Sequence, residues 1–147
     1  MIIMDVKADN LFAFRNFHIN MSYPKKIVDS SIQNEFLIER PNFRYKKVNI
    51  IMGGNATGKT SFGKLLMCFT NYLEDGAFSR FTSAIADSNR EAFLQIDFVL
   101  HDTNLYRLIF KADPKVNEKY SEDEIKIIIK SVPIGKTDRY ESCAKKR

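Results

Sequence analysis

The chain has little cysteine, no tryptophan and no long apolar run. Two cysteines, Cys68 and Cys143, are too few for a disulfide framework, so we expect a reducing, cytoplasmic compartment. No run approaches the roughly 18 apolar residues of a membrane span. Early charges at Asp5, Lys7 and Asp9 are also unlike a signal peptide. We therefore expect no association with a membrane.

The charge balance indicates no strong preference for a polyanionic partner. The chain has 23 basic and 18 acidic residues, which gives a mild net charge of +5. The densest basic cluster is 145–147, and we interpret it as a solvated terminal segment rather than a nucleic-acid contact. DNA stays open as a partner. With 147 residues, 44% of them apolar, the chain is long enough for one globular domain with its own core.

One motif outweighs the rest of the sequence, the run Gly53-Gly54-Asn55-Ala56-Thr57-Gly58-Lys59-Thr60. It fits the P-loop pattern, in which glycines let the backbone N–H groups curl around a phosphate at the start of a helix. Lys59 would reach the β- and γ-phosphates as a point charge, and the Thr60 hydroxyl would take one position on Mg²⁺. The motif therefore predicts ATP and Mg²⁺ as ligands, with Lys59 as the catalytic residue.

The flanks of the motif support a strand, a loop and a helix in that order. The apolar, β-branched run 48–52 predicts a buried strand. Gly76 is the residue type favoured just past a helix end. The predicted apolar face of the helix between them is Phe62, Leu65, Leu66, Phe69 and Leu73. The alternative is that these glycines form an ordinary turn by chance. A chance turn would not be expected to lie between a strand pattern and a helix pattern.

The remaining segments divide the single predicted lobe, 1–147, into successive parts. We expect opening strands in 1–22, an insertion in 23–45, the P-loop unit in 46–76 and a β meander in 92–132. Residues 77–91 after the P-loop helix are ambiguous, with a helical stretch plausible, and strands then follow without the βαβ alternation of most P-loop kinases. The predicted fold class is therefore α/β, a P-loop NTPase lobe with a mixed sheet around the P-loop helix and an antiparallel meander.

Three segments together resemble a known family. Residues 53–60 are very similar to the glycine loop of ABC-like ATPases of the SMC, RecF, OLD and abortive-infection group. Residues 10–17 resemble the opening turn of that family, and 92–111 resemble the antiparallel sheet that follows its P-loop helix. The resemblance implies an ATP-binding lobe of a longer ATPase in DNA repair or anti-phage defence. It also implies a second ATPase head, as in a homodimer, or a C-terminal lobe as partner.

The chain departs from this family in its acidic and signature motifs. A Walker B element, four apolar residues followed by Asp-Glu, is missing, and the nearest run, 94–97, is interrupted by Gln95. No LSGGQ-like signature is present either. We therefore expect ATP hydrolysis only when the missing elements are supplied. A small-molecule P-loop kinase and a non-catalytic scaffold with a vestigial loop remain as alternatives.

Several residues carry two interpretations each. Asn55 either touches phosphate or holds the loop through its side chain. Arg15 lies either near the base or ribose, as the resemblance implies, or on the surface as an ordinary arginine. Gln95 either senses Mg²⁺ or is a plain strand glutamine. The predicted nucleotide-binding residues are Gly53, Gly54, Asn55, Ala56, Thr57, Gly58, Lys59, Thr60, Ser61 and Arg15, and the predicted metal ligands are Thr60 and Gln95.

Overall fold

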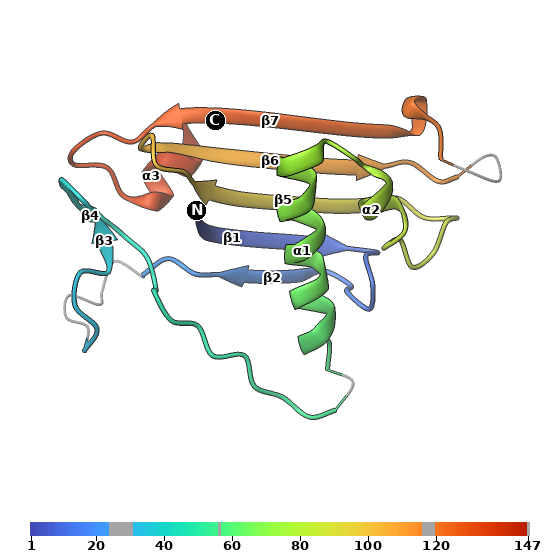
Figure 1. Ribbon diagram of the computed structural model, residues 1–147, viewed down its shortest axis with the longest axis horizontal. Coiled ribbons are helices and arrows are strands. Elements are labelled where there is room, and N and C mark those ends of the chain that lie inside the picture. Colours follow the sequence, from blue (N-terminus) through green and yellow to red (C-terminus); the bar gives the residue numbers. More distant parts are fainter. Residues whose placement is uncertain (24–30, 56, 116–119, 147) are drawn as a thin grey trace.

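The computed structural model describes residues 1–23, 31–55, 57–115 and 120–146, and in this part the chain has an α/β fold. A five-stranded sheet, a two-stranded hairpin and three α-helices make up the described structure (Figure 1). The strands are β1 Ile2–Asp9, β2 Phe17–Asn20, β3 Phe36–Leu37, β4 Arg40–Arg44, β5 Ala92–Val99, β6 Asn104–Ala112 and β7 Ile125–Pro133. The helices are α1 Lys59–Asp75, α2 Ser79–Thr82 and α3 Tyr140–Lys145. None of these helices is long and apolar enough to cross a membrane.

The five strands are arranged in the order β2-β1-β5-β6-β7, and every pair is antiparallel. The predicted opening strands and the predicted meander are therefore confirmed. The predicted mixed sheet is wrong for the described residues, because the segment 48–52 does not enter the sheet as a strand. Figure 1 shows this segment as a long connection that runs outside β2 before it reaches α1.

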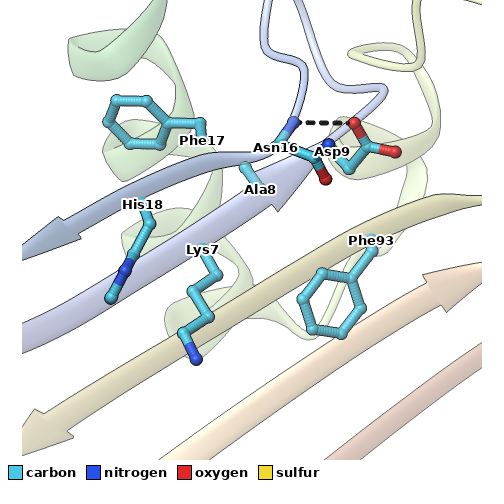
Figure 2. Close-up of a pocket in the computed structure, with 7 residues that line it drawn as sticks. All are labelled: Lys7, Ala8, Asp9, Asn16, Phe17, His18 and Phe93. Carbon is cyan, nitrogen blue, oxygen red and sulfur yellow. Dashed lines mark hydrogen bonds between the residues drawn. The ribbon is translucent and has the colours of Figure 1, made fainter.

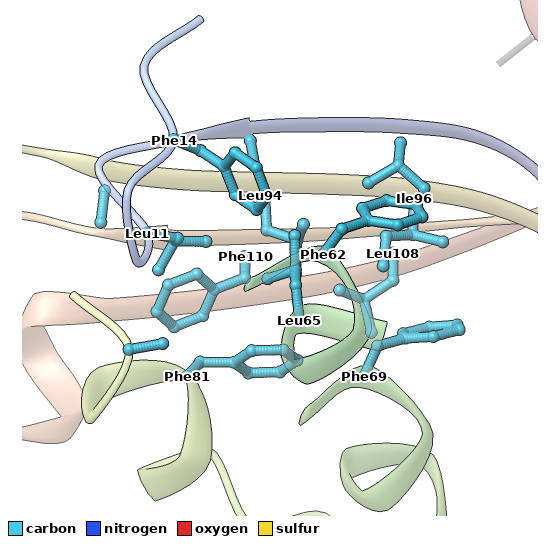
Figure 3. Close-up of a cluster of buried hydrophobic side chains, with 14 of the residues drawn as sticks. Leu11, Phe14, Phe62, Leu65, Phe69, Phe81, Leu94, Ile96, Leu108 and Phe110 are labelled. Atoms are coloured by element: carbon cyan, nitrogen blue, oxygen red, sulfur yellow. The ribbon is translucent and has the colours of Figure 1, made fainter. Parts of the chain in front are cut away.

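Helix α1 packs across one face of the sheet and forms the main core with it. Phe62, Leu65 and Phe69 are buried one helical turn apart, as the 3.6-residue period predicts. They lie against Leu94 and Ile96 of β5 and their neighbours (Figure 3). Leu73 was predicted on the same face but is exposed. The helix ends as predicted at Gly76, which has a φ of 70° and donates its N–H to the Tyr72 carbonyl at 2.9 Å.

A second, smaller core lies on the opposite face of the sheet, under α3 and β4. Arg107 holds Asp97 with two bonds of 2.7 Å, and the Tyr140 hydroxyl donates to the same carboxylate at 2.8 Å. Burial, and then the charge of Asp97, raise the pKa of Tyr140 well above its ordinary value. Tyr140 and Cys143 are buried. The chain therefore packs against the sheet through α3. Lys145 and Lys146 are exposed, as predicted for 145–147, and Arg147 lies outside the described residues.

Candidate functional site

The glycine-rich loop, residues 53–58, has one position whose backbone favours glycine and one where a side chain would meet the loop itself. Gly58 has a φ of 91°, a left-handed conformation that side chains rarely adopt, and α1 starts at the next residue. A Cβ atom at Gly58 would also lie 3.2 Å from the Phe14 ring. A Cβ atom at Gly53 would lie 2.6 Å from the Thr57 hydroxyl oxygen. A larger residue is therefore strained at Gly58, and at Gly53 it would displace the Thr57 hydroxyl.

Lys59 folds back across this loop. Its ammonium group donates to the Gly53 carbonyl at 2.7 Å and to the Gly54 carbonyl at 2.5 Å. The Thr57 hydroxyl, which itself donates to the Gly54 carbonyl at 2.9 Å, lies 3.4 Å from the same ammonium group. One positive charge therefore connects the start of the loop to the start of the helix. Lys59 stays exposed, so this charge is open to a ligand.

The start of α1 leaves its backbone donors free for an anion. The helix has no side-chain cap and no acidic residue in its first turn. The first N–H groups of any helix have no partner within it, and the helix dipole adds partial positive charge there. A recess of about 240 Å³ lies at this helix start. It is lined by Ala13, Asn55, Thr57, Gly58, Lys59, Thr60 and Ser61.

A turn formed by residues 10–16 packs against the loop and completes the recess. The Asn10 side chain anchors this turn, because it donates to the Asp87 carbonyl at 2.8 Å and accepts from the Asp87 N–H at 2.9 Å. The Phe14 ring stacks on Phe17 at 4.3 Å between ring centres and lies next to Gly58. Phe14 is buried, and the half-buried Phe17 packs against the main core. The sequence did not reveal the contact between Phe14 and Gly58, since nothing local connects two residues so far apart in the chain.

The structure brings most of the predicted nucleotide-binding residues together. Asn55, Thr57, Gly58, Lys59, Thr60 and Ser61 line the recess, and the Gly53 and Gly54 carbonyls bind the Lys59 ammonium group. Arg15 is exposed in the turn whose Ala13 lines the same recess. Ala56 lies outside the described residues. The residues predicted from the motif are therefore largely contiguous in space, whereas Arg15 does not line the recess.

The two predicted metal ligands are not brought together. Thr60 is in the first turn of α1, on the side of the sheet that this helix covers. Gln95 lies on the other side, because its neighbours Leu94 and Ile96 face α1 and side chains alternate along a strand. Among the described residues, no three His, Cys, Asp or Glu side chains form a group that could hold a metal. Thr60 is thus the one predicted metal ligand that lines the recess.

The segment before the loop differs from its prediction. It was predicted as a buried strand, but Ile50 is 78% exposed and Met52 is 86% exposed. An extended segment becomes a strand only where a neighbouring edge can bond its N–H and C=O groups. The edges of the described sheet are β2 and β7, and neither pairs with this segment. The apolar run therefore lies outside the described core.

The loop, the Lys59 ammonium group and the uncapped helix together form a site with the chemistry of an anion receptor. Backbone N–H groups, a flexible cation and a hydroxyl converge on one recess at the start of α1. A comparison with protein-family models and with curated proteins finds no match for this chain.

Proposed function

We propose that this chain is the ATP- and Mg²⁺-binding lobe of an ABC-like ATPase. The observation that carries the proposal is the geometry of the glycine-rich loop. Its left-handed Gly58 leads into an uncapped helix, and Lys59 lies across the loop carbonyls. A phosphate chain is the ligand that such a helix start and lysine recognise together.

The residues of the recess fit the roles that this ligand needs. The loop N–H groups and the helix start would surround the phosphates. The Lys59 ammonium group would leave the Gly53 and Gly54 carbonyls to contact the β- and γ-phosphates. The Thr60 hydroxyl is exposed at the recess and would contribute one oxygen to Mg²⁺. The bound Mg²⁺ would offset charge on the phosphate oxygens.

Among the described residues, no acidic side chain lines the recess, whereas hydrolysis needs an acidic group near the phosphates and Mg²⁺. Asp97, the end of the nearest Walker B-like run, is buried and holds Arg107 and Tyr140. Among the described residues, no group of three His, Cys, Asp or Glu side chains could hold a metal ion. Hydrolysis would therefore need a second ATPase head or a C-terminal lobe. The exposed apolar run 48–52, next to the loop, is consistent with an incomplete core at this side.

The process that the ATPase serves is proposed from the resemblance of its loop, opening turn and meander. These segments are similar to ATPases of DNA repair and anti-phage defence, and we propose one of these two roles. A fold supports many functions, so this part of the proposal rests on the motif and not on the sheet.

The test is a calorimetric titration of Mg·ATP into the wild-type chain and the Lys59→Ala variant, with phosphate release followed in parallel. One charge-assisted phosphate contact is worth about 1.5–3 kcal/mol, so the affinity should fall roughly 10- to 100-fold. Lys64→Ala is the matched control, because Lys64 is an exposed lysine of the same helix that does not line the recess. Its affinity should equal that of the wild type.

Two other outcomes would contradict the proposal, and two more would favour an alternative function. Equal affinity in wild type and Lys59→Ala would contradict the proposed site. Turnover by the wild-type chain alone would contradict the proposed need for a second part. Phosphoryl transfer to a metabolite would favour the kinase. A folded chain that binds no nucleoside triphosphate would favour the non-catalytic scaffold.

A further inference from the structure

The face of the five-stranded sheet turned away from α1 is covered at one end by α3 and β4. Its other end is exposed to solvent. Figure 2 looks at this end, with α1 behind the strands and Lys7, His18 and Phe93 in front. We name as the open face the residues Lys7 of β1, Phe93 of β5, Lys111 of β6, and Lys126 and Lys130 of β7. All four lysines are exposed.

The strand register places two like charges directly opposite each other on this face, because Lys111 stands across from Lys126. Lys130 stands across from Arg107, whose charge is already paired with Asp97. Like charges in such pairs destabilise a sheet, because the Cβ atoms are only about 5 Å apart. Within the described part of the chain, the lysines of the open face form no ion pair. An anion bound between the lysines would remove this repulsion.

Three carboxylates on the same side of the sheet are already engaged. Asp97 is fully buried and binds Arg107. Asp5 is 3% exposed, and its carboxylate lies 2.8 Å from the His18 ring nitrogen. The Asp9 carboxylate, at the rim of this face, forms an ion pair with the Arg90 guanidinium at 3.4 Å. The charge that the open face presents to a partner is therefore positive, which fits a polyanion.

An aromatic ring lies among these lysines. Phe93 is half-buried and lines a recess of about 200 Å³ together with Lys7 and His18. In Figure 2 the flat face of the Phe93 ring is turned toward the viewer, on the side of the sheet away from α1. The Lys111 ammonium group is 5.9 Å from the centre of this ring. A ring face among cations is the arrangement that binds single strands, since unpaired bases stack on it while lysines follow the backbone.

We infer that the open face binds single-stranded nucleic acid. The lysines contact the phosphates, and Phe93 stacks on one base. A duplex keeps its bases stacked on each other and would leave the ring unused. The surface lies on the other side of the sheet from α1, so this inference goes beyond the proposed nucleotide site and is tested without ATP.

The first experiment measures binding of a fluorescein-labelled oligo(dT) strand to the full chain by anisotropy over a series of salt concentrations. Lys111→Gln with Lys126→Gln removes the opposing pair. Lys64→Gln with Lys136→Gln removes the same charge outside the open face. Two lost phosphate contacts should lower the slope of log affinity against log salt by about 1.4 for the first variant, and the control should keep the wild-type slope.

Thermal unfolding separates lost binding from lost folding. Because the opposing lysines repel each other, Lys111→Gln with Lys126→Gln should unfold no lower than the wild type. Oligo(dT) should raise the unfolding temperature of the wild type and of the control, but much less that of this variant. An equal loss of slope in the control would overturn the inference, because it would indicate a general effect of net charge.

The second experiment isolates the stacking contact. Phe93→Ala should lower the affinity for oligo(dT) about 5- to 100-fold and leave the salt slope unchanged. Phe36→Ala, at an exposed phenylalanine of β3, is the matched control and should bind like the wild type. No effect of Phe93→Ala would overturn the inference. Equal or tighter binding of a duplex, or of a poly-glutamate peptide, would overturn it as well.

Discussion

Two apolar, β-branched runs of this chain differ in whether they form a strand of the sheet. The run 125–129 is part of β7, which pairs with β6 along its whole length. The run 48–52 has a similar composition but lies outside the sheet, with Ile50 78% exposed. Ile127 packs against the main core, and no such contact is made by Ile50. An apolar run therefore becomes a strand only where the tertiary structure supplies a neighbouring edge and a surface to cover.

The largest expected loss of stability is for a substitution in the five-stranded sheet, to which β7 belongs. Phe98 of β5 is 1% exposed and contacts the Phe69 and Tyr106 rings at 5.1 and 5.4 Å between centres. Phe98→Ala leaves a cavity in this core, so the free energy of unfolding should fall by about 3–5 kcal/mol. Urea denaturation followed by circular dichroism measures it. A loss below about 1 kcal/mol would mean that this core is far looser than the structure indicates.

The next effect concerns the packed C-terminal segment. Tyr140→Phe removes the hydroxyl that binds the buried Asp97 carboxylate, so the free energy of unfolding should fall by about 1–3 kcal/mol. Burial raises the pKa of Tyr140 above its ordinary value of 10.0, so the folded state holds this proton more tightly than the unfolded state. The stability from Tyr140 is therefore complete below about pH 10 and is lost as the pH rises above it.

The measurement is urea denaturation of the wild type and Tyr140→Phe at neutral pH and at a series of values above pH 10. The wild type should lose stability more steeply than the variant over the alkaline range. Arg139→Gln, next to Tyr140 but exposed, is the control and should follow the wild type. Parallel alkaline slopes in wild type and Tyr140→Phe would show that Tyr140 does not carry this pH dependence.

The smallest expected change in stability is for a substitution in the run 48–52, which lies outside the sheet. Ile50→Lys should change the free energy of unfolding by no more than about 0.5 kcal/mol, because the side chain is already solvated. The same change should reduce self-association at high protein concentration, since exposed apolar runs pair with other chains. Denaturation and sedimentation velocity measure the two quantities. A clear loss of stability would show that the segment packs in the isolated chain, and the contrast with β7 would then fail.

Prediction from the sequence succeeded where the signal was local. The helix from Lys59, its end at Gly76 and the three strands of the meander follow from periodicity and turn residues. It left the two interpretations of Gln95 open, and only the structure shows that this residue lies on the face away from α1 and from Thr60. It did not reveal that Tyr140 is buried and binds an aspartate 43 residues away, because this contact is not local. The contact of Phe14 with Gly58 is long-range in the same sense.

The sequence by itself determined the glycine-rich loop and the helix that follows it. Left-handed glycine, a helix start without a cap and an apolar stripe are properties of a few consecutive residues, which is why they can be predicted without a partner. Only the tertiary structure decided that the run 48–52 stays outside the sheet and that lysines of β6 and β7 stand opposite each other. Strand pairing needs hydrogen-bond partners from distant parts of the chain, and no local pattern specifies which edge will be present.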